Sequence, residues 1–530
     1  MNIWKATSVS LLAVTIALSG CAINGTKYEQ DKEYKLTILH TNDHHGRFWQ
    51  SKRGEYGLSA RMTLVNQIRE EVAAEGGEVL LLSGGDINTG VPGSDLQNAE
   101  PDFKGMAMMG YDAMAVGNHE FDNPREVLMQ QAEWAGFPFL SANIFHKDSN
   151  KTLFPAYEMF EVMDNRIAIV GFTTEDTVKI GNPEYTADLD FKSPVEVAET
   201  LIPELQKKSD LVIAVTHMGH YDNGNYGGNA PGDVTLARSV PGIDVIVGGH
   251  SQVPLFEPDV QNGTLILQAH EWGKYVGRLD LTIKNGDIID YEYRLIPVNL
   301  KDKVKDAEGN STYVLREQEI AQDLGMLAML SPYQKKGSEA INVVVGSADG
   351  NFIGDRSVIR SNPTNLGVLI TKAQMEKANA DLAIMNSGGI RADLEGGEIT
   401  YKDVLTVQPF ANILSYVDLT GEELIDYLKV AASKEAGSGA YAQFYGVDIT
   451  IAGTELKEAT IGGKAIDPAG TYRLALNSFM ASGGDGYPKV SDHPNYVNTG
   501  FVDADLLVEY IQKNSPLSIS DYEPVNVTRM

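Results

Sequence analysis

The chain has 530 residues, which is too long for a single hydrophobic core and predicts two or three domains. Hydrophobic residues make up 43% of it and aromatic residues 8%, a composition that excludes a disordered protein. The formal net charge of −29 at pH 7 disfavours binding to nucleic-acid polymers and to anionic membrane surfaces. A small phosphorylated substrate remains compatible with this charge. Salt screens the net charge of the protein over ~8–10 Å, so a local cationic site can still attract a phosphate.

The first 20 residues resemble a bacterial lipoprotein signal peptide. Lys5 provides a positive charge, and residues 9–18 form an apolar run that is too short to span a bilayer. The run ends in the tetrapeptide LSGC, which resembles a lipobox and contains the only cysteine of the chain, Cys21. A buried thiol is the alternative. The resemblance implies that Cys21 is acylated and anchors an exported protein to the cell envelope. Ala22 after it favours the outer membrane, and residues 21–34 are a polar tether.

Strand-like runs and helical stretches alternate from residue 35 to about residue 297. Strands are predicted at 36–39, 79–82, 167–170, 211–215 and 245–247, and helices at 59–75 and 124–135. Because the strands are apolar on both faces, we predict a layered α/β domain over residues 35–315, with a charged loop at 299–311.

The second half of the chain begins with a predicted linker. Residues 316–330 place apolar side chains at helical spacing, Pro332 is a stop signal, and we assign a linker helix to residues 316–340. A second, smaller α/β domain is predicted over residues 341–530, starting with a strand at 341–345. The sequence has no internal repeat.

Five segments of the first domain share one design, a strand-like run followed at once by Gly, Asp, Asn or His. They are LHTNDHHG at 39–46, LSGGD at 82–86, VGNHEFD at 116–122, VTHMGH at 215–220 and VGGHSQ at 247–252. Ligands of α/β sheets collect beyond the carboxyl ends of the strands, so we expect these ends to share one crevice. Their carboxylate, amide and imidazole groups suit Zn, Mn, Co, Fe or Mg. One such segment alone is more often a cap or a surface feature, whereas five together predict a metal site.

The histidines of these segments do not all fit one role. Asp43 and His45 are two residues apart, so an extended backbone would point both side chains to one side. His44 lies between them and is expected to face away. We interpret four histidines as structural or as partners of metal ligands, namely His40, His44, His220 and His270.

These segments resemble the calcineurin-like metallophosphoesterase superfamily, whose pattern is D-x-H, G-D, G-N-H-E/D, H and G-H-x-H. Gln252 replaces the last His, as is common in the 5'-nucleotidase branch. The resemblance implies a β-sandwich flanked by helices that holds two divalent metals, with Zn, Mn, Co or Mg as candidates. It implies that Asp86 bridges them, with two further sets of ligands: Asp43, His45 and Gln252 in one site, and Asn118, His217 and His250 in the other.

The resemblance also implies the catalytic residues. His119 and Asp122 would form a pair beside the metals, in which Asp122 orients the imidazole and His119 stabilises charge on the reacting phosphate or the leaving group. A metal-bound hydroxide would attack phosphorus in line, without a covalent phospho-enzyme.

The second domain has a phosphate-binding pattern of its own. Arg356 and Arg360 are four residues apart, and the segment NSGGIR at 386–391 delivers Arg391 after a glycine turn. Surface ion pairs are the alternative for these arginines. Phe410 and Phe479 lie in turn-rich segments; a lone Phe is usually part of a core, but two could clamp a base.

These segments, with GGDGY at 483–487, resemble the C-terminal domain of periplasmic 5'-nucleotidases with UDP-sugar hydrolase activity. The resemblance implies that Phe410 and Phe479 sandwich the base, that Asn412 contacts the base edge and that Asp485 accepts hydrogen bonds from the ribose. It further implies that Arg356, Arg360 and Arg391 hold the phosphates and that Gly439 lines the pocket.

The sequence thus predicts a lipid-anchored, monomeric enzyme that hydrolyses nucleoside 5'-phosphates, with nucleoside di- and triphosphates and UDP-sugars as further substrates. The resemblance also implies that the second domain swings between open and closed forms. Two alternatives stay open: a 2',3'-cyclic phosphodiesterase with 3'-nucleotidase activity, and a non-catalytic nucleotide-binding surface lipoprotein.

Overall fold

The computed structural model describes residues 27–180, 183–221, 230–305 and 311–529. The signal peptide, Cys21 and the first part of the tether therefore lie outside the described residues. In the part of the chain that is described, no helix combines the length and the apolarity needed to cross a membrane.

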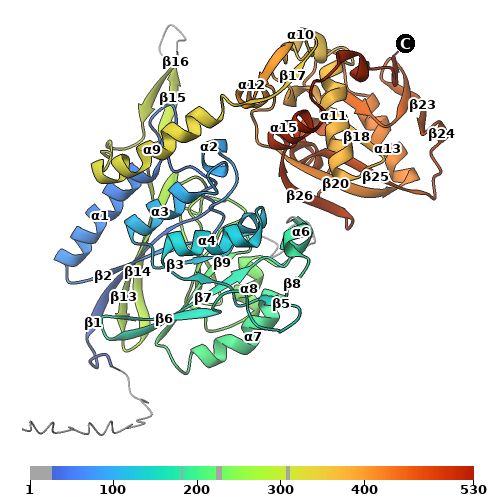
Figure 1. Cartoon of the computed structure of the whole chain (residues 1–530). Helices are drawn as coiled ribbons and strands as arrows, with labels where there is room; N and C mark the ends of the chain where they lie inside the picture. Colours follow the sequence, from blue (N-terminus) through green and yellow to red (C-terminus); the bar gives the residue numbers. More distant parts are fainter. Residues whose placement is uncertain (1–26, 181–182, 222–229, 306–310, 530) are drawn as a thin grey trace, which may run out of the picture.

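The first domain contains two six-stranded sheets (Figure 1). The order of the first is β14 (Asp287–Pro297), β13 (Tyr275–Lys284), β1 (Glu33–Thr41), β2 (Glu78–Ser83), β3 (Ala113–Ala115) and β4 (Phe139–Leu140). The order of the second is β11 (Asp259–Gln261), β12 (Thr264–Leu267), β10 (Val245–Val247), β9 (Leu211–His217), β7 (Asn165–Thr173) and β6 (Tyr157–Val162).

The two sheets pack face to face, because their strands are apolar on both sides. In β1, Leu36 and Ile38 point into the core between the sheets, together with Val215 of β9, whereas Leu39 faces the helices. The helical layer over the first sheet consists of α1 (Leu58–Ala74), α3 (Glu100–Met109) and α4 (Arg125–Ala135), and the layer over the second consists of α7 (Pro194–Leu205) and α8 (Asp233–Ser239). The result is an α/β/β/α sandwich, and the predicted layered class is confirmed.

The segment after the sandwich differs from the prediction. Residues 299–311 were expected to form a loop, but β15 (Lys301–Lys305) and β16 (Ser311–Leu315) pair as an antiparallel hairpin. The linker helix, expected from residue 316, is α9 (Leu324–Ala340) and begins where the Asp323 side chain accepts a hydrogen bond from the Met326 N–H. Pro332 does not stop it: the helix continues through this residue, which shows that one proline need not end a helix that is packed against a domain.

The second domain is built on a five-stranded mixed sheet. Its order is β21 (Ala442–Tyr445), β18 (Leu382–Asn386), β25 (Thr471–Asn477), β20 (Ile413–Thr420) and β26 (Tyr496–Val502). The helices α11 (Asn365–Ala378) and α15 (Asp503–Asn514) share one core with this sheet, and α13 (Gly421–Ala432) shares a second core with it. The first strand of the domain, expected at 341–345, is β17 (Val344–Ala348), which pairs with β19 (Gly397–Thr400).

Smaller elements complete both domains. A second, four-stranded sheet of the C-terminal domain has the order β24 (Lys464–Ala465), β23 (Glu455–Ile461), β22 (Asp448–Ala452) and β27 (Val527–Arg529). The remaining short elements are α2 (Pro92–Asp95), η1 (His119–Phe121), β5 (Ile144–His146), α5 (Thr177–Ile180), α6 (Pro183–Thr186), β8 (Leu189–Phe191), α10 (Arg356–Ile359), η2 (Ser387–Gly389), α12 (Tyr401–Val407), α14 (Ser478–Ala481), η3 (Gly484–Gly486) and η4 (Ile519–Tyr522).

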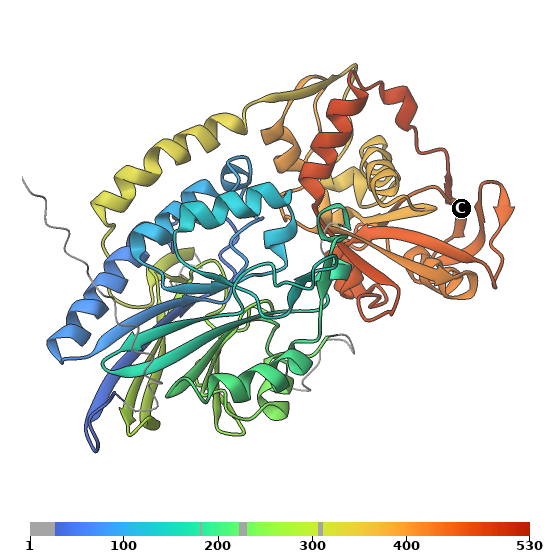
Figure 2. The ribbon, with the colours of Figure 1, turned by 60° about the horizontal axis from the view of Figure 1, so that its bottom comes forward.

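The two domains lie side by side and are joined by α9, which runs along the first domain before the chain enters the second (Figures 1 and 2). Away from this linker, α5 of the first domain contacts β26 of the second. Two-domain organisation with mixed sheets flanked by helices is therefore confirmed.

Candidate active site

The predicted metal ligands lie where strands of both sheets end. β1, β2 and β3 run parallel in one sheet, and β9 and β10 run parallel in the other. Backbone hydrogen bonds connect the loops that follow them: the Asp43 N–H donates to Gly85 O at 2.9 Å, and the His45 N–H donates to Asp86 O at 3.1 Å. Two sheets, rather than one, supply the site.

The reasoning that an extended backbone aligns Asp43 and His45 is wrong. β1 ends at Thr41, and both residues have positive φ values, 49° for Asp43 and 50° for His45. Asp86, His250 and Gln252 are also left-handed, with φ of 56°, 75° and 57°. Such conformations cost ~1–3 kcal/mol each in a non-glycine residue and persist where the surroundings impose them, often at functional sites.

Glycines allow the loops of the two sheets to approach each other. A Cβ added to Gly84, after β2, would lie 2.4 Å from Gly248 O, and a Cβ on Gly249 would lie 2.5 Å from Gly84 O. Any other residue would separate these backbones, so the close contact of the two halves depends on glycine.

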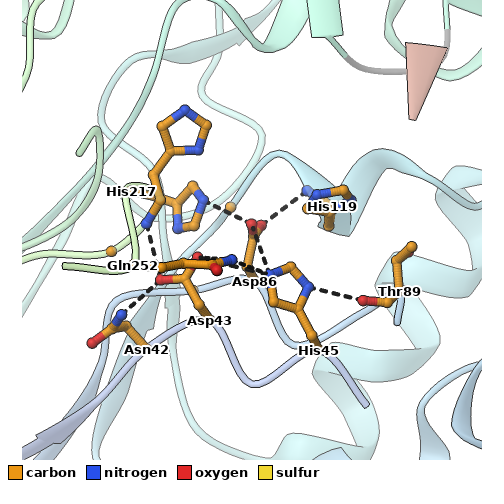
Figure 3. Close-up of polar contacts among 12 residues, drawn as sticks. Asn42, Asp43, His45, Asp86, Thr89, His119, His217 and Gln252 are labelled. Carbon is orange, nitrogen blue, oxygen red and sulfur yellow. Dashed lines mark hydrogen bonds and ion pairs between the residues drawn. The ribbon is translucent and has the colours of Figure 1, made fainter. Parts of the chain in front are cut away.

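The side chains converge on the carboxylate of Asp86 (Figure 3). Asp86 Oδ2 is 2.9 Å from His217 Nε2 and 4.0 Å from His45 Nε2. His45 Nε2 is 3.8 Å from Asp43 Oδ1, and His217 Nε2 is 3.1 Å from Asn118 Oδ1. Ligand atoms of Asp86, His217 and His250 lie within 4.8 Å of one another. The structure thus brings together all of these predicted ligands.

Gln252 also reaches this cluster. Its Nε2 lies 2.9 Å from His45 Nε2 and 3.5 Å from Asp43 Oδ1. A metal would be bound through Oε1, because the amide nitrogen has no lone pair to offer, so a ligating Gln252 would present the other side of its amide.

The electrostatics of the cluster suit divalent cations. Burial, together with the neighbouring Asp86, raises the pKa of Asp43 to about 7. Burial lowers the pKa of His45 to about 4 and that of His250 to about 3, so both imidazoles are neutral and able to bind metal. A buried carboxylate whose charged form is disfavoured and neutral imidazoles beside it form a set that cations would stabilise.

His119 and Asp122 form a close pair beside the cluster. His119 Nδ1 is 2.6 Å from Asp122 Oδ2, and the His119 N–H donates to Asp86 Oδ1 at 2.9 Å. Burial alone would lower the pKa of His119, but the carboxylates of Asp122 and Asp86 outweigh it and raise this pKa to about 10. The Thr89 hydroxyl also donates to Asp122, which is thereby held in place. This pKa favours the protonated form of His119, which with His45 and Asp86 forms a second set of atoms within 4.8 Å.

Glu120 lies at the candidate site but was not predicted from the sequence. Its buried carboxylate accepts hydrogen bonds from the backbone N–H groups of Asp86 at 3.0 Å, Ile87 at 2.8 Å and Gly117 at 2.7 Å. It thereby connects the loop of the bridging Asp86 to the loop of Asn118 and His119. The sequence did contain a signal for this role. Glu120 directly follows Asn-His in a glycine-rich segment, and the predicted metal ligands are complete without it.

Asn42 was also missed. Its amide donates to Asp43 Oδ2 at 2.7 Å, and its Oδ1 accepts from the Ala269 N–H at 2.8 Å. Asn42 therefore orients the Asp43 carboxylate from the side away from the cluster.

The four histidines set aside above have other partners. His44 Nε2 lies 2.8 Å from Asp102 Oδ1 on α3, so the expectation that His44 faces away is confirmed. His40 is buried next to the Tyr293 hydroxyl, and His270 Nδ1 is 2.8 Å from Gln252 O. His220 Nε2 is 2.8 Å from Asp259 Oδ2.

The predicted nucleotide contacts of the second domain gather around two glycine turns. Gly388 donates its N–H to Gly439 O at 2.7 Å, and a Cβ on Gly439 would lie 3.7 Å from Arg360 Nη1. Burial and the nearby Arg356 and Arg391 lower the pKa of Arg360, which places three cations close together. This grouping is typical of a site for anions.

The aromatic residues flank the same region. Phe410 is 54% exposed and Phe479 43% exposed, unlike core phenylalanines. The guanidinium carbon of Arg391 lies 5.5 Å from the ring centroid of Phe410, and Asn386 donates to Asp485 Oδ2 at 2.8 Å. Asn412 is different: its backbone carbonyl accepts a hydrogen bond from the Asp503 N–H of α15 at 2.8 Å, so its main chain is tied to the scaffold.

The predicted nucleotide contacts do not line the cavity next to the candidate metal site. A cavity of about 470 Å³ lies in front of His250 and Gln252, and its second-domain wall is formed by residues such as Ser491, His493 and Asn498. None of the predicted nucleotide contacts is among the described residues that line it. In Figure 1, α10, which begins at Arg356, lies at the end of the second domain opposite β26.

Comparison with known proteins identifies the family. The calcineurin-like phosphoesterase family matches residues 36–254, and the 5'-nucleotidase C-terminal domain family matches residues 344–492. A 5'-nucleotidase of Vibrio cholerae is 55% identical over 539 residues, which cover 98% of this chain and 97% of the relative. Protein UshA of Escherichia coli is 54% identical and covers 94% of each chain. The chain belongs to the 5'-nucleotidase/UshA family.

Its fold is also that of a solved structure, the NAD nucleotidase of Haemophilus influenzae. The TM-score is 0.75 at 22% identity, over 94% of this chain and all (100%) of the other. The prediction of an enzyme of the 5'-nucleotidase/UshA type, a metal-dependent phosphoesterase with both characteristic domains, is confirmed.

Proposed function

We propose that this protein hydrolyses nucleoside 5'-phosphates to nucleoside and inorganic phosphate, and that nucleoside di- and triphosphates and UDP-sugars are also substrates. One observation carries the proposal: ligand-type side chains from four other strand ends surround the Asp86 carboxylate, which itself follows β2. The family relationship and the cluster of three arginines in the second domain support a nucleotide as the substrate.

The donor set fits two divalent cations, with Zn, Mn, Co or Mg as candidates. Asp86 would lie between them, with Asp43, His45 and Gln252 on one cation and Asn118, His217 and His250 on the other. Such a pair supplies positive charge for phosphate oxygens and lowers the pKa of water.

The protein's own groups complete the reaction. His119, kept protonated by Asp122 and Asp86, donates a hydrogen bond to a phosphate oxygen as negative charge develops there. Asp122 fixes the imidazole through Nδ1, so that Nε2 is the atom available to the substrate. Neither residue forms a bond to phosphorus, and no phospho-enzyme is expected.

The second domain holds the nucleoside. Arg356, Arg360 and Arg391 bind the phosphate chain, Phe410 and Phe479 stack on the base, and Asp485 accepts hydrogen bonds from the ribose, beside Gly439. Asn412 contacts the base edge through its side-chain amide, while its backbone carbonyl keeps its hydrogen bond from the Asp503 N–H. Stacking contributes ~1–3 kcal/mol per base, so this domain supplies binding energy remote from the reaction.

Turnover then needs a change of domain arrangement, because the nucleotide contacts and the metal ligands do not share a cavity here. An engineered disulfide between α5 and β26 would hold the present arrangement, and Cys21 is the only native cysteine that could compete with it. We expect the oxidised protein to be inactive and the reduced protein to be active. Full activity of the oxidised protein would refute the domain movement.

Export and anchoring complete the proposal. Cys21 becomes the acylated N-terminus of the mature protein, which is held at the cell envelope, in the outer membrane. The mass of the N-terminal peptide from the native protein tests this: it should carry acyl chains, and a Cys21→Ala variant should not.

A substrate panel tests the catalytic proposal. Chelated protein is reloaded with single metals, and phosphate release is measured from 5'-AMP, 3'-AMP, ATP and UDP-glucose. Release from 5'-AMP that depends on added metal is the expected result. Preference for 3'-AMP would point to the cyclic phosphodiesterase alternative, and metal-loaded protein without phosphate release would point to a binding protein.

A further inference from the structure

A second histidine–carboxylate pair lies next to the candidate metal site. His220 follows the predicted ligand His217 by three residues, and its Nε2 is 2.8 Å from Asp259 Oδ2. Asp259 is held in turn, because Gln261 donates to its Oδ1 at 2.6 Å. The function proposed above gives roles to His119 and Asp122 but none to His220 and Asp259.

Hydrogen bonds connect the pair to the loop of the metal ligands. The His220 N–H donates to Ser251 Oγ at 2.9 Å, and Ser251 lies between His250 and Gln252. The Ser251 hydroxyl donates in turn to Gln268 at 2.9 Å. His220 is therefore fixed at a set position relative to the place where a phosphate would bind.

His220 also lines the cavity in front of His250 and Gln252. In the present domain arrangement its volume is about 470 Å³, within the range of roughly 300–1,000 Å³ that is typical of ligand sites. A substrate whose phosphates contact the metal site would extend into this space with the part that is not nucleoside.

The residues that line the cavity determine which chemical groups the non-nucleoside part of the substrate can carry. Among the described residues that line the cavity, none is Lys or Arg, so nothing there would neutralise a further phosphate group. The first-domain part of the wall, which stays beside the metal site when the second domain moves, offers the imidazoles of His220 and His250, the Gln252 amide, the Ser251 hydroxyl and the Asp176 carboxylate instead. Asp259 behind His220 keeps its imidazole in a fixed orientation. Such groups form hydrogen bonds with a neutral, hydroxyl-rich ligand.

We propose that His220, oriented by Asp259, binds the sugar of a nucleoside diphosphate sugar and thereby favours such substrates over nucleotides that end in phosphate. Because Nε2 is committed to Asp259, the sugar hydroxyl meets the imidazole through Nδ1. His220 contacts the substrate, and Asp259 is a positioning residue that acts through it. The proposal rests on the function proposed above and assigns one part of the substrate to named residues.

The test compares three substrates that share one nucleoside: UMP, UDP and UDP-glucose. For His220→Ala and Asp259→Asn we expect kcat/KM for UDP-glucose to fall about tenfold, and kcat/KM for UMP and UDP to change by less than twofold. Metal content should equal that of the parent protein. His146→Ala removes a histidine of the first domain outside this cavity and is expected to leave all three values unchanged.

Each other outcome has a definite meaning. Equal losses on all three substrates would assign His220 to the metal site and overturn the proposal, as would an unchanged rate with UDP-glucose. Parent protein that hydrolyses UMP but not UDP-glucose would overturn this inference and leave the nucleotidase function standing. Parent protein that hydrolyses none of the three would instead refute the proposed function.

Discussion

The two candidate sites of this chain are built on opposite principles. The side chains around Asp86 are buried or half-buried and lie within 4.8 Å of one another in two sets. Backbone hydrogen bonds between loops of the first sheet, and the His250 N–H that donates to Asp43 Oδ2, fix them. The nucleotide contacts are partly exposed, with Phe410 at 54% and Phe479 at 43%. The comparison indicates that the reacting centre is preorganised, whereas the specificity site gains its last contacts when substrate binds.

Asp86→Ala is the strongest way to break this comparison. The substitution removes the carboxylate on which both ligand sets converge and leaves His217 without its ion-pair partner. We expect activity toward 5'-AMP to fall at least a thousandfold and metal content to drop below that of the parent, measured by phosphate release and elemental analysis. Retained metal with a retained rate would contradict the bridging role.

Metal removal should affect the first domain and spare the second. Without cations the buried Asp43 and Asp86 repel each other, so chelation is expected to abolish activity and to lower the temperature of unfolding of the first domain. Binding of a nucleoside to the second domain should persist in the chelated protein, as measured by calorimetry. Loss of nucleoside binding on chelation would show that the two sites are not separate.

Glu120→Gln tests how strictly the first site is preorganised. The amide would place a donor against backbone N–H groups of Asp86, Ile87 and Gly117. Partners of this kind commonly contribute 10–100-fold to metal affinity or activity, and we expect a loss of about that size. Excess metal in the assay should recover much of the rate, which a simply misfolded variant would not do; Glu133→Gln on the exposed side of α4 is the matched control.

Phe479→Ala sharpens the other half of the comparison and has the smallest expected effect. Loss of one stacking partner should raise KM for 5'-AMP about tenfold, in line with ~1–3 kcal/mol per stacked base. Turnover of a small aryl phosphate should not change, because that substrate has no base to stack. Equal losses on both substrates would argue against stacking.

Patterns with a local physical cause were predictable from the sequence. The strands of both sheets and the helices α1 and α4 follow from apolar periodicity, and the ligand-bearing loops follow from strand ends rich in Gly, Asp and His. Asp43 and His45 were expected to lie together because of the two-residue period of an extended strand, and that reason is wrong. The two side chains converge because both residues adopt left-handed backbone next to the neighbouring strand end. The alternation of side chains along a strand does not predict this conformation.

Features that depend on tertiary packing were not predictable. Continuation of α9 through Pro332 depends on contacts of that helix with the first domain. The hydrogen bond of the Asn412 carbonyl depends on the N–H of Asp503, which is 91 positions later in the chain. The roles of Glu120 and Asn42 depend on backbone groups of other segments. Which face of the second domain lies against the first depends on the interface between them, and no local sequence pattern predicts it.

The contact between Gly84 and Gly249 has a consequence for how this enzyme can vary. The distance between the ligand-bearing loops of the two sheets is limited by how closely these two peptide backbones pass. A single methyl group at either position would widen the gap while every ligand stayed in the sequence. Loss of activity in a lineage could therefore begin at a residue without a functional group, and a search confined to ligand positions would overlook it.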